Sequence, residues 1–447
     1  MRQTLDQILI RSSQSNFDTL LAALRKKLAA AARFAGYDSE ENKTVVAILR
    51  DVAEQGDQRL AAYTERFDGV RLSAGQFRVP AEDLEKAHRQ MDGEILSSLR
   101  KAIANVREYQ QRILVANKSG LSAGAGIKYV PIGRVGVCVP GAAAPLPSTV
   151  VMTVVPAQVA GVQEIAVVSP PRHKGSVHPV ILAACHELGV NEVYRIGGVQ
   201  AVAALAFGTQ TIRKVDMIVG PGNKWVQAAK RYVAGDHVRI DSVAGPSEVL
   251  IIANDQANPA WVAADMLSQA EHGTDSSAVL ITDSEKLGRA VLESLKQQLG
   301  ELTRADEASQ SLVSYSRIVV VESMDRAVEI ANDFAGEHLE IQCGRQSRQV
   351  AQRITNAGAI FIGPYSPVAV GDYWAGPSHT LPTGSRAKFA SALTSNDFVK
   401  SISIIAYDRK RLAASAEDIV RLAEVEGLDA HARSIKIRQK SSMGSPE

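Results

Sequence analysis

The pattern of hydrophobic and polar positions changes twice along the chain. Between residue 15 and about residue 115, Ala, Leu, Glu, Lys and Arg recur at helical spacing, as in "DTLLAALRKKLAAAARFAG" and "SSLRKAIANVREYQQRIL". This spacing predicts helices that each bury one face. From residue 134, short β-branched runs alternate with helix-length segments, and after residue 385 the pattern favours helices again.

The middle region contains seven or eight apolar runs of strand length. They are "RVGVCVP", "EIAVVSP", "VYRIGG", "MIVGPG", "EVLIIAN", "AVLITD", "RIVVVES" and "AIFIG". Runs that are apolar throughout are typical of parallel strands covered on both faces. A break near "VRIDSVAGPSEVL" favours two sheets over one. We therefore expect an α/β protein with parallel sheets.

Parallel sheets of this kind bind ligands in crevices beyond the carboxyl ends of their strands. The dinucleotide fingerprint GxGxxG is absent from the loops that follow the predicted strands. The segment "VGPGNKWVQAAK" offers only Gly220 and Gly222 before a helix that begins near Asn223. The free amides of such a helix can hold a pyrophosphate. A plain tight turn explains the same residues.

Composition and charge narrow the classes of partner. The 447 residues leave room for two or three domains, and 50 basic against 48 acidic residues give a net charge of +2. No overall field selects nucleic acid or an anionic membrane, which favours a small substrate. The N-terminal sequence lacks a signal peptide and the apolar stretches are too short to span a membrane, so we expect a cytoplasmic protein.

One helix carries a candidate metal site. In "NPAWVAADMLSQAEHG", Asn258 is expected as the N-cap and Pro259 at the first helical position. At about 3.6 residues per turn, Gln269 lies on the buried stripe and His272 on its flank, while Glu271 points away. Gln269 and His272 can share a divalent cation, which would satisfy the buried amide. A capped helix whose Gln bonds to backbone is the alternative.

A second Glu–His pair occurs in "NDFAGEHLEIQC". Gly336 is expected to end a helix and "LEIQC" to form a short strand, so Glu337 and His338 can both reach a crevice. An imidazole can take a proton from an alcohol, and a partly buried carboxylate can activate water. A solvated polar turn is the alternative.

Two later segments add candidate polar groups. The segment "SPVAVGDYWAGPSHTLPTGSRAKF" is expected to be a long Gly/Pro-rich loop that carries Asp372 and His379. Loops of this length are usually functional or disordered, and its aromatic residues argue against disorder. The segment "EVEGLDAHARSIKIR" carries Glu426 and His431 at a helix end or turn, where solvated side chains are the ordinary explanation.

Taken together, these segments closely resemble the histidinol dehydrogenase family. The resemblance runs from about residue 45 through residue 437 and rests on five motifs in order: "GPSEVLIIA", "DMLSQAEHGTDS", "GEHLEI", "GDYWAGPSHTLPTG" and "EGLDAHARS". Two positions depart from the family pattern. Cys138 stands where the family often has Tyr, and Gly336 stands in "AGEHL" where the usual motif is "APEHL".

The resemblance implies roles for individual residues. Glu337 and His338 match the catalytic acid/base pair. The positions that match the ligands of one zinc ion per subunit are Gln269, His272, Asp372 and His431. The positions that match or neighbour substrate contacts are Ser247, Gln269, His272, His338, Asp372, His379, Glu426 and His431. The positions that match NAD contacts are Cys138, Gln200 and Asn223.

The resemblance also implies a fold and an assembly. The resemblance implies two incomplete Rossmann-like domains, each built on a parallel sheet, together with small helical N- and C-terminal elements. The implied division is a segment of residues 1–34, a metal-binding and catalytic domain of residues 35–135 with 254–390, an NAD-binding domain of residues 136–253 and a C-terminal domain of residues 391–447. In a homodimer, Glu426 and His431 would complete the partner subunit's site.

The implied reaction is a four-electron oxidation of L-histidinol through L-histidinaldehyde to L-histidine, the last steps of histidine biosynthesis, with two NAD. His338 would take the hydroxyl proton in the first step, and Glu337 would activate water in the second. Zinc would orient the nitrogen donors of the substrate. The alternatives are a dehydrogenase for a sulfonated diol, a zinc hydrolase, and a non-catalytic binding protein.

Overall fold

The computed structural model describes residues 5–31, 39–141 and 145–440. Contacts divide the chain into two units. The larger unit contains Met1–Ile113 and Ile132–Phe398, and the smaller unit contains Leu114–Pro131 and Val399–Glu447. The expected segments 1–34 and 391–447 lie partly outside the described residues. Among the described residues, no helix has the length and apolar character needed to cross a membrane.

A five-stranded parallel sheet forms the first core of the larger unit. Its strand order is β6-β5-β4-β7-β8. The strands are β4 (Arg134–Cys138), β5 (Glu164–Val168), β6 (Glu192–Tyr194), β7 (Met217–Val219) and β8 (Arg239–Ile240). Because β5 and β6 extend the sheet on one side of β4 and β7 extends it on the other, the order reverses between β4 and β7.

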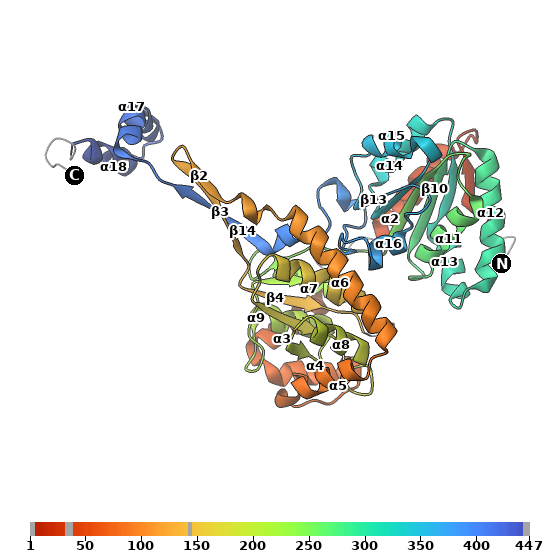
Figure 1. The fold of residues 1–447 in the computed structure, drawn as a ribbon, viewed down its shortest axis with the longest axis horizontal. Helices are drawn as coiled ribbons and strands as arrows, with labels where there is room; N and C mark the ends of the chain where they lie inside the picture. Colours follow the sequence, from red (N-terminus) through yellow and green to blue (C-terminus); the bar gives the residue numbers. More distant parts are fainter. Residues whose placement is uncertain (1–4, 32–38, 142–144, 441–447) are drawn as a thin grey trace. The chain divides into compact units, whose positions relative to one another are not determined.

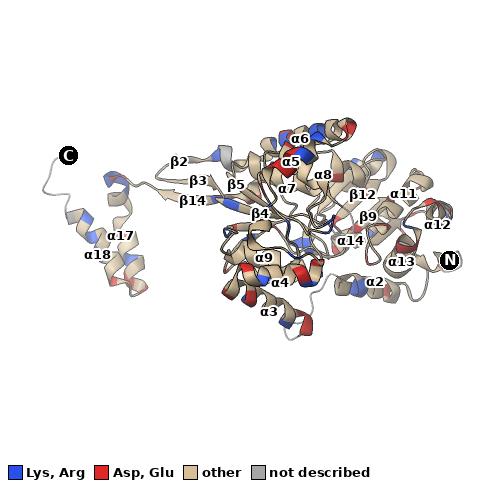
Figure 2. Cartoon of the chain, turned by 90° about the horizontal axis from the view of Figure 1, so that it is seen from below, with Lys and Arg blue, Asp and Glu red and all other residues tan. Residues whose placement is uncertain are grey.

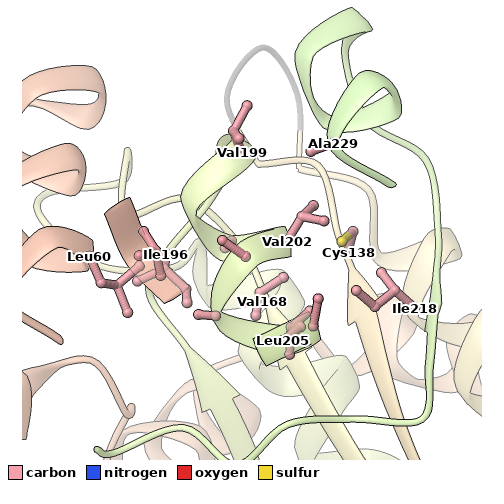
Figure 3. Packing of buried hydrophobic residues seen from close by; sticks show 14 of the residues in the cluster. Leu60, Cys138, Val168, Ile196, Val199, Val202, Leu205, Ile218 and Ala229 are labelled. Carbon is pink, nitrogen blue, oxygen red and sulfur yellow. The ribbon is translucent and has the colours of Figure 1, made fainter. Parts of the chain in front are cut away.

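Helices cover both faces of this sheet. The connecting helices are α7 (Pro147–Val159), α8 (Pro179–Glu187), α9 (Gly198–Phe207) and α10 (Lys224–Val233), and the preceding helices are α3 (Glu40–Gln55), α4 (Asp57–Asp68), α5 (Ala81–Arg89) and α6 (Gly93–Ile113). α3 packs on α9, α5 on α8 and α6 on α7. Leu205 of α9 packs so closely on β4 that a Cβ at Gly136 would lie 2.8 Å from its methyl carbon (Figure 3).

A six-stranded parallel sheet forms the second core of the larger unit. Its order is β1-β11-β10-β9-β12-β13. The strands are β1 (Leu9–Arg11), β9 (Glu248–Ala253), β10 (Ser277–Thr282), β11 (Arg317–Val320), β12 (His338–Gln342) and β13 (Ala359–Ile362). α11 (Pro259–Ala270), α12 (Glu285–Gln298) and α13 (Ala305–Tyr315) cover one face. α2 (Phe17–Ala31), α14 (Met324–Phe334) and α15 (Ser347–Gln352) cover the other (Figure 1).

Strand β12 is buried along its whole length, yet it is not apolar. Leu339 and Ile341 point into the core beneath α2 and α14. His338, Glu340 and Gln342 therefore point to the opposite face, toward α11. The short helix α16 (Val368–Tyr373) also packs on that face, since Val368 belongs to its core.

The smaller unit is built differently. β14 (Val399–Ile405), β3 (Ala125–Pro131) and β2 (Gly120–Ser122) form an antiparallel sheet in the order β14-β3-β2. The helices α17 (Arg409–Val425) and α18 (Asp429–Lys440) follow. The short 3-10 helices of the described residues are η1 (Asp6–Ile8), η2 (Ala74–Gln76), η3 (Val115–Lys118), η4 (Leu299–Glu301), η5 (Gly344–Gln346), η6 (Arg386–Lys388) and η7 (Ser395–Phe398).

The α/β class with parallel sheets is confirmed, and each of the eight expected runs forms a strand. Among the described residues, the pattern did not reveal the strands β1, β2, β3, β8 and β14, of which β2, β3 and β14 form the antiparallel sheet. Charged residues of both signs lie along the helices, as on α3, α5 and α6 (Figure 2). The helices α3 to α6, which the sequence analysis grouped with residues 254–390, contact α7 to α9; the domain boundaries stay a prediction.

A buried ion pair fixes the turn after β7. Lys230 and Asp241 are at most 2% exposed, and the Lys230 ammonium donates to Asp241 Oδ1 at 2.5 Å and to the carbonyl of Gly220 at 2.8 Å. The amide of Gly220 donates to Asp241 Oδ2 at 2.7 Å. Both backbone polar groups of Gly220 are thus held by one pair. At this residue φ is +101°, and a Cβ would lie 2.3 Å from the carbonyl oxygen of Cys138, so only glycine fits.

We expect Lys230→Met to lower the free energy of unfolding by about 3–5 kcal/mol, because it leaves the Asp241 carboxylate buried without its cation. Lys224→Met on the same helix is the matched control. It breaks the pair of Lys224 with Glu41, whose side chains are 65% and 44% exposed, and should cost under about 1 kcal/mol. Urea unfolding measures both. Equal losses would show that the buried pair is not a special support of this turn.

Candidate active site

The candidate acid/base pair lies at the amino edge of the six-stranded sheet. His338 is the first residue of β12 and pairs with Val249 in β9, and Glu337 directly precedes it. α11 runs back toward the same edge, since β10 begins at Ser277 shortly after this helix ends. The sequence analysis expected ligands beyond the carboxyl ends of strands. In this sheet the polar groups gather at the opposite edge because the polar face of β12 begins there.

The backbone of Glu248 holds both members of the pair. Its amide donates to Glu337 Oε2 at 2.9 Å, and its carbonyl oxygen lies 3.0 Å from His338 Nδ1. Because a carbonyl oxygen only accepts, Nδ1 carries the hydrogen. Nδ1 also lies 3.5 Å from Glu337 Oε2. His338 Nε2 is thus the nitrogen left for proton exchange, 3.7 Å from Asp372 Oδ1.

Burial and mutual charge shift the pKa values of the pair. Glu337 and His338 are 6% and 4% exposed. Burial raises the pKa of Glu337 to about 7, although the charge of His338 and the Glu248 amide act to lower it. Burial acts to lower the pKa of His338, but the carboxylates of Glu337 and Asp372 outweigh it and raise the pKa to about 9. Both groups can therefore exchange protons in the neutral to mildly alkaline range.

Asp372 lies on the six-residue helix α16 and not on the long loop that was expected. Burial acts to raise the pKa of its carboxyl, but His338 Nε2 at 3.7 Å and the charges of His338, His379 and His272 lower it below the ordinary value. Burial lowers the pKa of His379, which bonds to the backbone of Asp372. The structure thus brings one ionised carboxylate within electrostatic reach of three imidazoles.

Gln269 stands out because its amide is buried without a partner. The sequence analysis placed it on the buried stripe of a helix with Asn258 as N-cap, and both features are confirmed: Gln269 is 1% exposed, and Asn258 accepts from the amide of Ala260 at 2.9 Å. Neither its oxygen nor its nitrogen has a hydrogen-bond partner among the described residues. An unpaired buried amide costs about 1–3 kcal/mol, so the site favours a ligand at this position.

The orientation of His272 also leaves one of its ring nitrogens free to bind a ligand. Its Nδ1 lies 2.9 Å from the carbonyl oxygen of Ser268, so Nδ1 carries the hydrogen and the lone pair of Nε2 is free. The amide oxygen of Gln269, an imidazole nitrogen and the Asp372 carboxylate are donors that suit a divalent cation such as zinc. Within the ranges that the structure describes, no three His, Cys, Asp or Glu side chains are grouped tightly enough to hold a metal.

The remaining expected site residues divide between the two units. Ser247 is partly buried, and its carbonyl accepts from the Ser277 amide at 3.0 Å. Glu426 and His431 are exposed and belong to the smaller unit. The larger unit therefore contains Gln269, His272 and Asp372, but not the fourth expected zinc ligand.

The residues expected to contact NAD lie at the carboxyl edge of the five-stranded sheet. Cys138 ends β4, Gln200 lies in the first turn of α9, and Asn223 follows β7. The strand order reverses between β4 and β7, the usual place for a nucleotide in such sheets. Gln200 is 1% exposed, and its Nε2 has no partner among the described residues, so this edge also contains an unsatisfied donor.

Asn223 and Cys138 also have structural roles. Asn223 caps α10, because its side-chain oxygen accepts from the amides of Trp225 and Val226 at 3.1 Å. Cys138 packs in the hydrophobic cluster of Figure 3, and burial raises the pKa of its thiol to about 11, so the thiol is neutral.

Sequence reasoning missed Glu248, whose backbone orients the acid/base pair, and the clamp of Lys230 and Asp241. The role of Glu248 depends on the pairing of β9 with β12, two strands that are far apart in the sequence. The polar residues Glu340 and Gln342 were also passed over. Their signal was present, since they alternate with apolar residues after His338 in "HLEIQ".

Comparison with known proteins gives a consistent result. The family model described as histidinol dehydrogenase matches residues 32–439. A histidinol dehydrogenase of Rhodopirellula baltica is 48% identical over 401 residues, which cover 89% of this chain and 86% of that protein. One of Geobacillus kaustophilus is 45% identical over 404 residues, covering 89% of this chain and 94% of that protein.

A solved structure agrees with the sequence matches. The crystal structure of histidinol dehydrogenase from Elizabethkingia anophelis superposes with a TM-score of 0.87 and 34% identity, covering 94% of this chain and 97% of that one. The chain therefore belongs to the histidinol dehydrogenase family of oxidoreductases.

Proposed function

We propose that this protein oxidises L-histidinol through L-histidinaldehyde to L-histidine in two NAD-dependent steps. The observation that carries this proposal is the buried pair of Glu337 and His338, oriented by one residue, Glu248, in a chain of this family. The pair supplies two groups that can accept protons from different donors. A two-step oxidation requires this, because an alcohol and a water molecule must be deprotonated in turn.

In the first step, the neutral form of His338, which becomes more populated as the pH rises toward its pKa of about 9, accepts the hydroxyl proton of the alcohol at Nε2 as a hydride leaves the same carbon. The carbonyl of Glu248 keeps the hydrogen of the ring on Nδ1 and so leaves Nε2 to act. The nearby Asp372 carboxylate stabilises the imidazolium that forms, 3.7 Å away. The proton then leaves to solvent.

In the second step, Glu337 removes a proton from the water that attacks the aldehyde carbon, and a second hydride leaves the hydrated carbon. The pKa of about 7 suits this role, since the carboxylate is partly ionised at neutral pH and basic enough to accept a proton. Each step releases two electrons as hydride, which accounts for the four-electron change.

The residues present fit both cofactors of the proposal. One zinc ion would be held by Gln269, His272, Asp372 and the partner subunit's His431. The Gln269 amide has no partner among the described residues, and the Nε2 of His272 is free to bind. Gln200, Asn223 and the turn at Gly220 would hold NAD. When bound, NAD supplies the hydride acceptor, and zinc orients the nitrogen donors of the substrate. Glu426 would attract the substrate's ammonium group.

The direct experiment measures NADH formation with L-histidinol and, separately, with dihydroxypropanesulfonate. We expect two NADH per L-histidinol and no turnover of the sulfonate, because a carboxylate at position 426 favours an amino alcohol over an anion. An inactive protein with L-histidinol, or NAD-independent cleavage of amides, would refute the proposal.

The two steps should separate in variants of the pair. His338→Gln should slow the oxidation of L-histidinol by about 10²–10⁴-fold and retain oxidation of added L-histidinaldehyde. Glu337→Gln should form the aldehyde with one NADH and stop there. Glu329→Gln, an exposed residue on α14, is the control and should keep both steps. Equal loss of both steps in both variants would contradict the division of roles.

The proposed homodimer with a shared site predicts complementation between inactive variants. We expect His338→Gln and His431→Gln to be inactive alone. After denaturation and joint refolding in equal amounts, about a quarter of wild-type activity should return, because half of the dimers are mixed and each has one intact site. A site built within one subunit would recover no activity, and a monomer in ultracentrifugation would also refute the shared site.

A further inference from the structure

The polar face of β12 continues past the catalytic pair. His338 is followed on the same face by Glu340 and Gln342, which are 1% and 4% exposed. Neither residue contributes to the reaction steps above. Two polar side chains in a buried strand are costly unless each has partners, so their contacts indicate their purpose.

Those contacts form a cluster with Asp265 of α11, in which Gln342 Oε1 has no partner among the described residues. The amide nitrogen of Gln342 donates to Asp265 Oδ2 at 2.7 Å and to Glu340 Oε2 at 3.1 Å. Glu340 and Asp265 also share a hydrogen bond, which requires a proton on one of the two carboxyls. Burial together with the charge of Asp265 raises the pKa of Glu340 to about 8, so Glu340 holds this proton at neutral pH.

The other oxygen of Glu340 reaches a third element. Glu340 Oε1 accepts from the amide of Val368, the first residue of α16, at 3.0 Å. Pro367 occupies the N-cap position of α16, and its side chain makes no capping hydrogen bond. A helix of six residues is unstable by itself, so its start must be held from outside. Glu340 provides that hold.

The three tied elements are the ones that carry the candidate site of the larger unit. Asp265 lies one turn before Gln269 on α11, on the same side of the helix. Val368 lies one turn before Asp372 on α16, and β12 begins at His338. A shift of either helix along β12 would therefore change the separation of Gln269 from Asp372.

We propose that Asp265, Glu340 and Gln342 are positioning residues, which hold α11 and α16 on β12 so that Gln269 and Asp372 can bind one divalent cation together. This inference rests on the proposed function, since the shared cation belongs to it. None of the three residues is among the expected ligands of the cation or the expected contacts of the substrate. Their effect is transmitted through two helix backbones.

The test is the zinc affinity of the metal-free protein, measured by equilibrium dialysis with a competing chelator. Glu340→Ala removes the bonds to Val368 and Asp265 and should weaken zinc binding by about 10–100-fold. Glu340→Gln should bind zinc nearly like the wild type, because its amide oxygen can accept from Val368 and its amide nitrogen can donate to Asp265, while only the 3.1 Å bond from Gln342 is lost. A role in stability alone would not predict this rescue of metal affinity.

Ser323→Ala is the matched control for general destabilisation. Ser323 caps α14 on the other face of the same sheet by accepting from the Arg326 amide at 3.2 Å. It should lower the melting temperature and leave zinc affinity unchanged. If Ser323→Ala weakens zinc binding as much as Glu340→Ala does, the positioning role is refuted.

A double variant and a ligand variant complete the design. Asp265→Ala with Glu340→Ala should weaken zinc binding by much less than the product of the single effects, because both break one cluster. Independent effects would refute the cluster. Gln269→Leu should remove a ligand and weaken binding. If Gln269→Leu binds zinc like the wild type, the proposed metal site fails; if it weakens binding and Glu340→Ala does not, only the positioning inference fails.

Discussion

Polar side chains on a strand that is buried on both faces must all find partners, and the candidate site is arranged around this constraint. Three of the five residues of β12 are polar, and the strand is buried throughout. The Gln342 amide nitrogen donates to Glu340 and Asp265, while His338 uses the backbone of Glu248. On this face of the sheet, the buried atoms without a partner among the described residues are His338 Nε2, Gln342 Oε1 and the Gln269 amide. At about 1–3 kcal/mol each, such atoms are retained where a bound molecule will satisfy them.

The expected binding residues lie at opposite edges of the two parallel sheets of the larger unit. In the five-stranded sheet, the residues expected to contact NAD follow the carboxyl ends of the strands, beside the reversal of strand order between β4 and β7. In the six-stranded sheet, the polar groups lie at the amino edge, where β12 begins. The difference has a local cause. Gly220 is held by a buried ion pair at a turn that only glycine can form, whereas His338 and Glu337 are held by the neighbouring strand.

Local sequence signals predicted what depends on neighbours in the chain. The apolar runs predicted eight of the strands, the capping residues of "NPAWVAADMLSQ" predicted the start of α11, and its helical spacing predicted the burial of Gln269. Long-range pairing was beyond those signals. The contact of Glu248 with His338 joins residues 90 positions apart, and β14 pairs with β3 across more than half of the chain. The helix that carries Asp372 was hidden because its cap comes from Glu340 and not from its own sequence.

This difference in support separates the acid/base pair from the metal-binding residues. Glu337 and His338 are fixed by hydrogen bonds to a neighbouring strand in the middle of a packed sheet, so their geometry is set when the domain folds. The expected metal ligands come from the last turn of α11, from the exposed turn that follows this helix, from a six-residue helix and from the smaller unit. His272 and His431 are exposed, so little packing holds these two side chains in place. A cation shared among them would contribute part of the order of its own site, so binding of the metal and ordering of these ligands should be coupled.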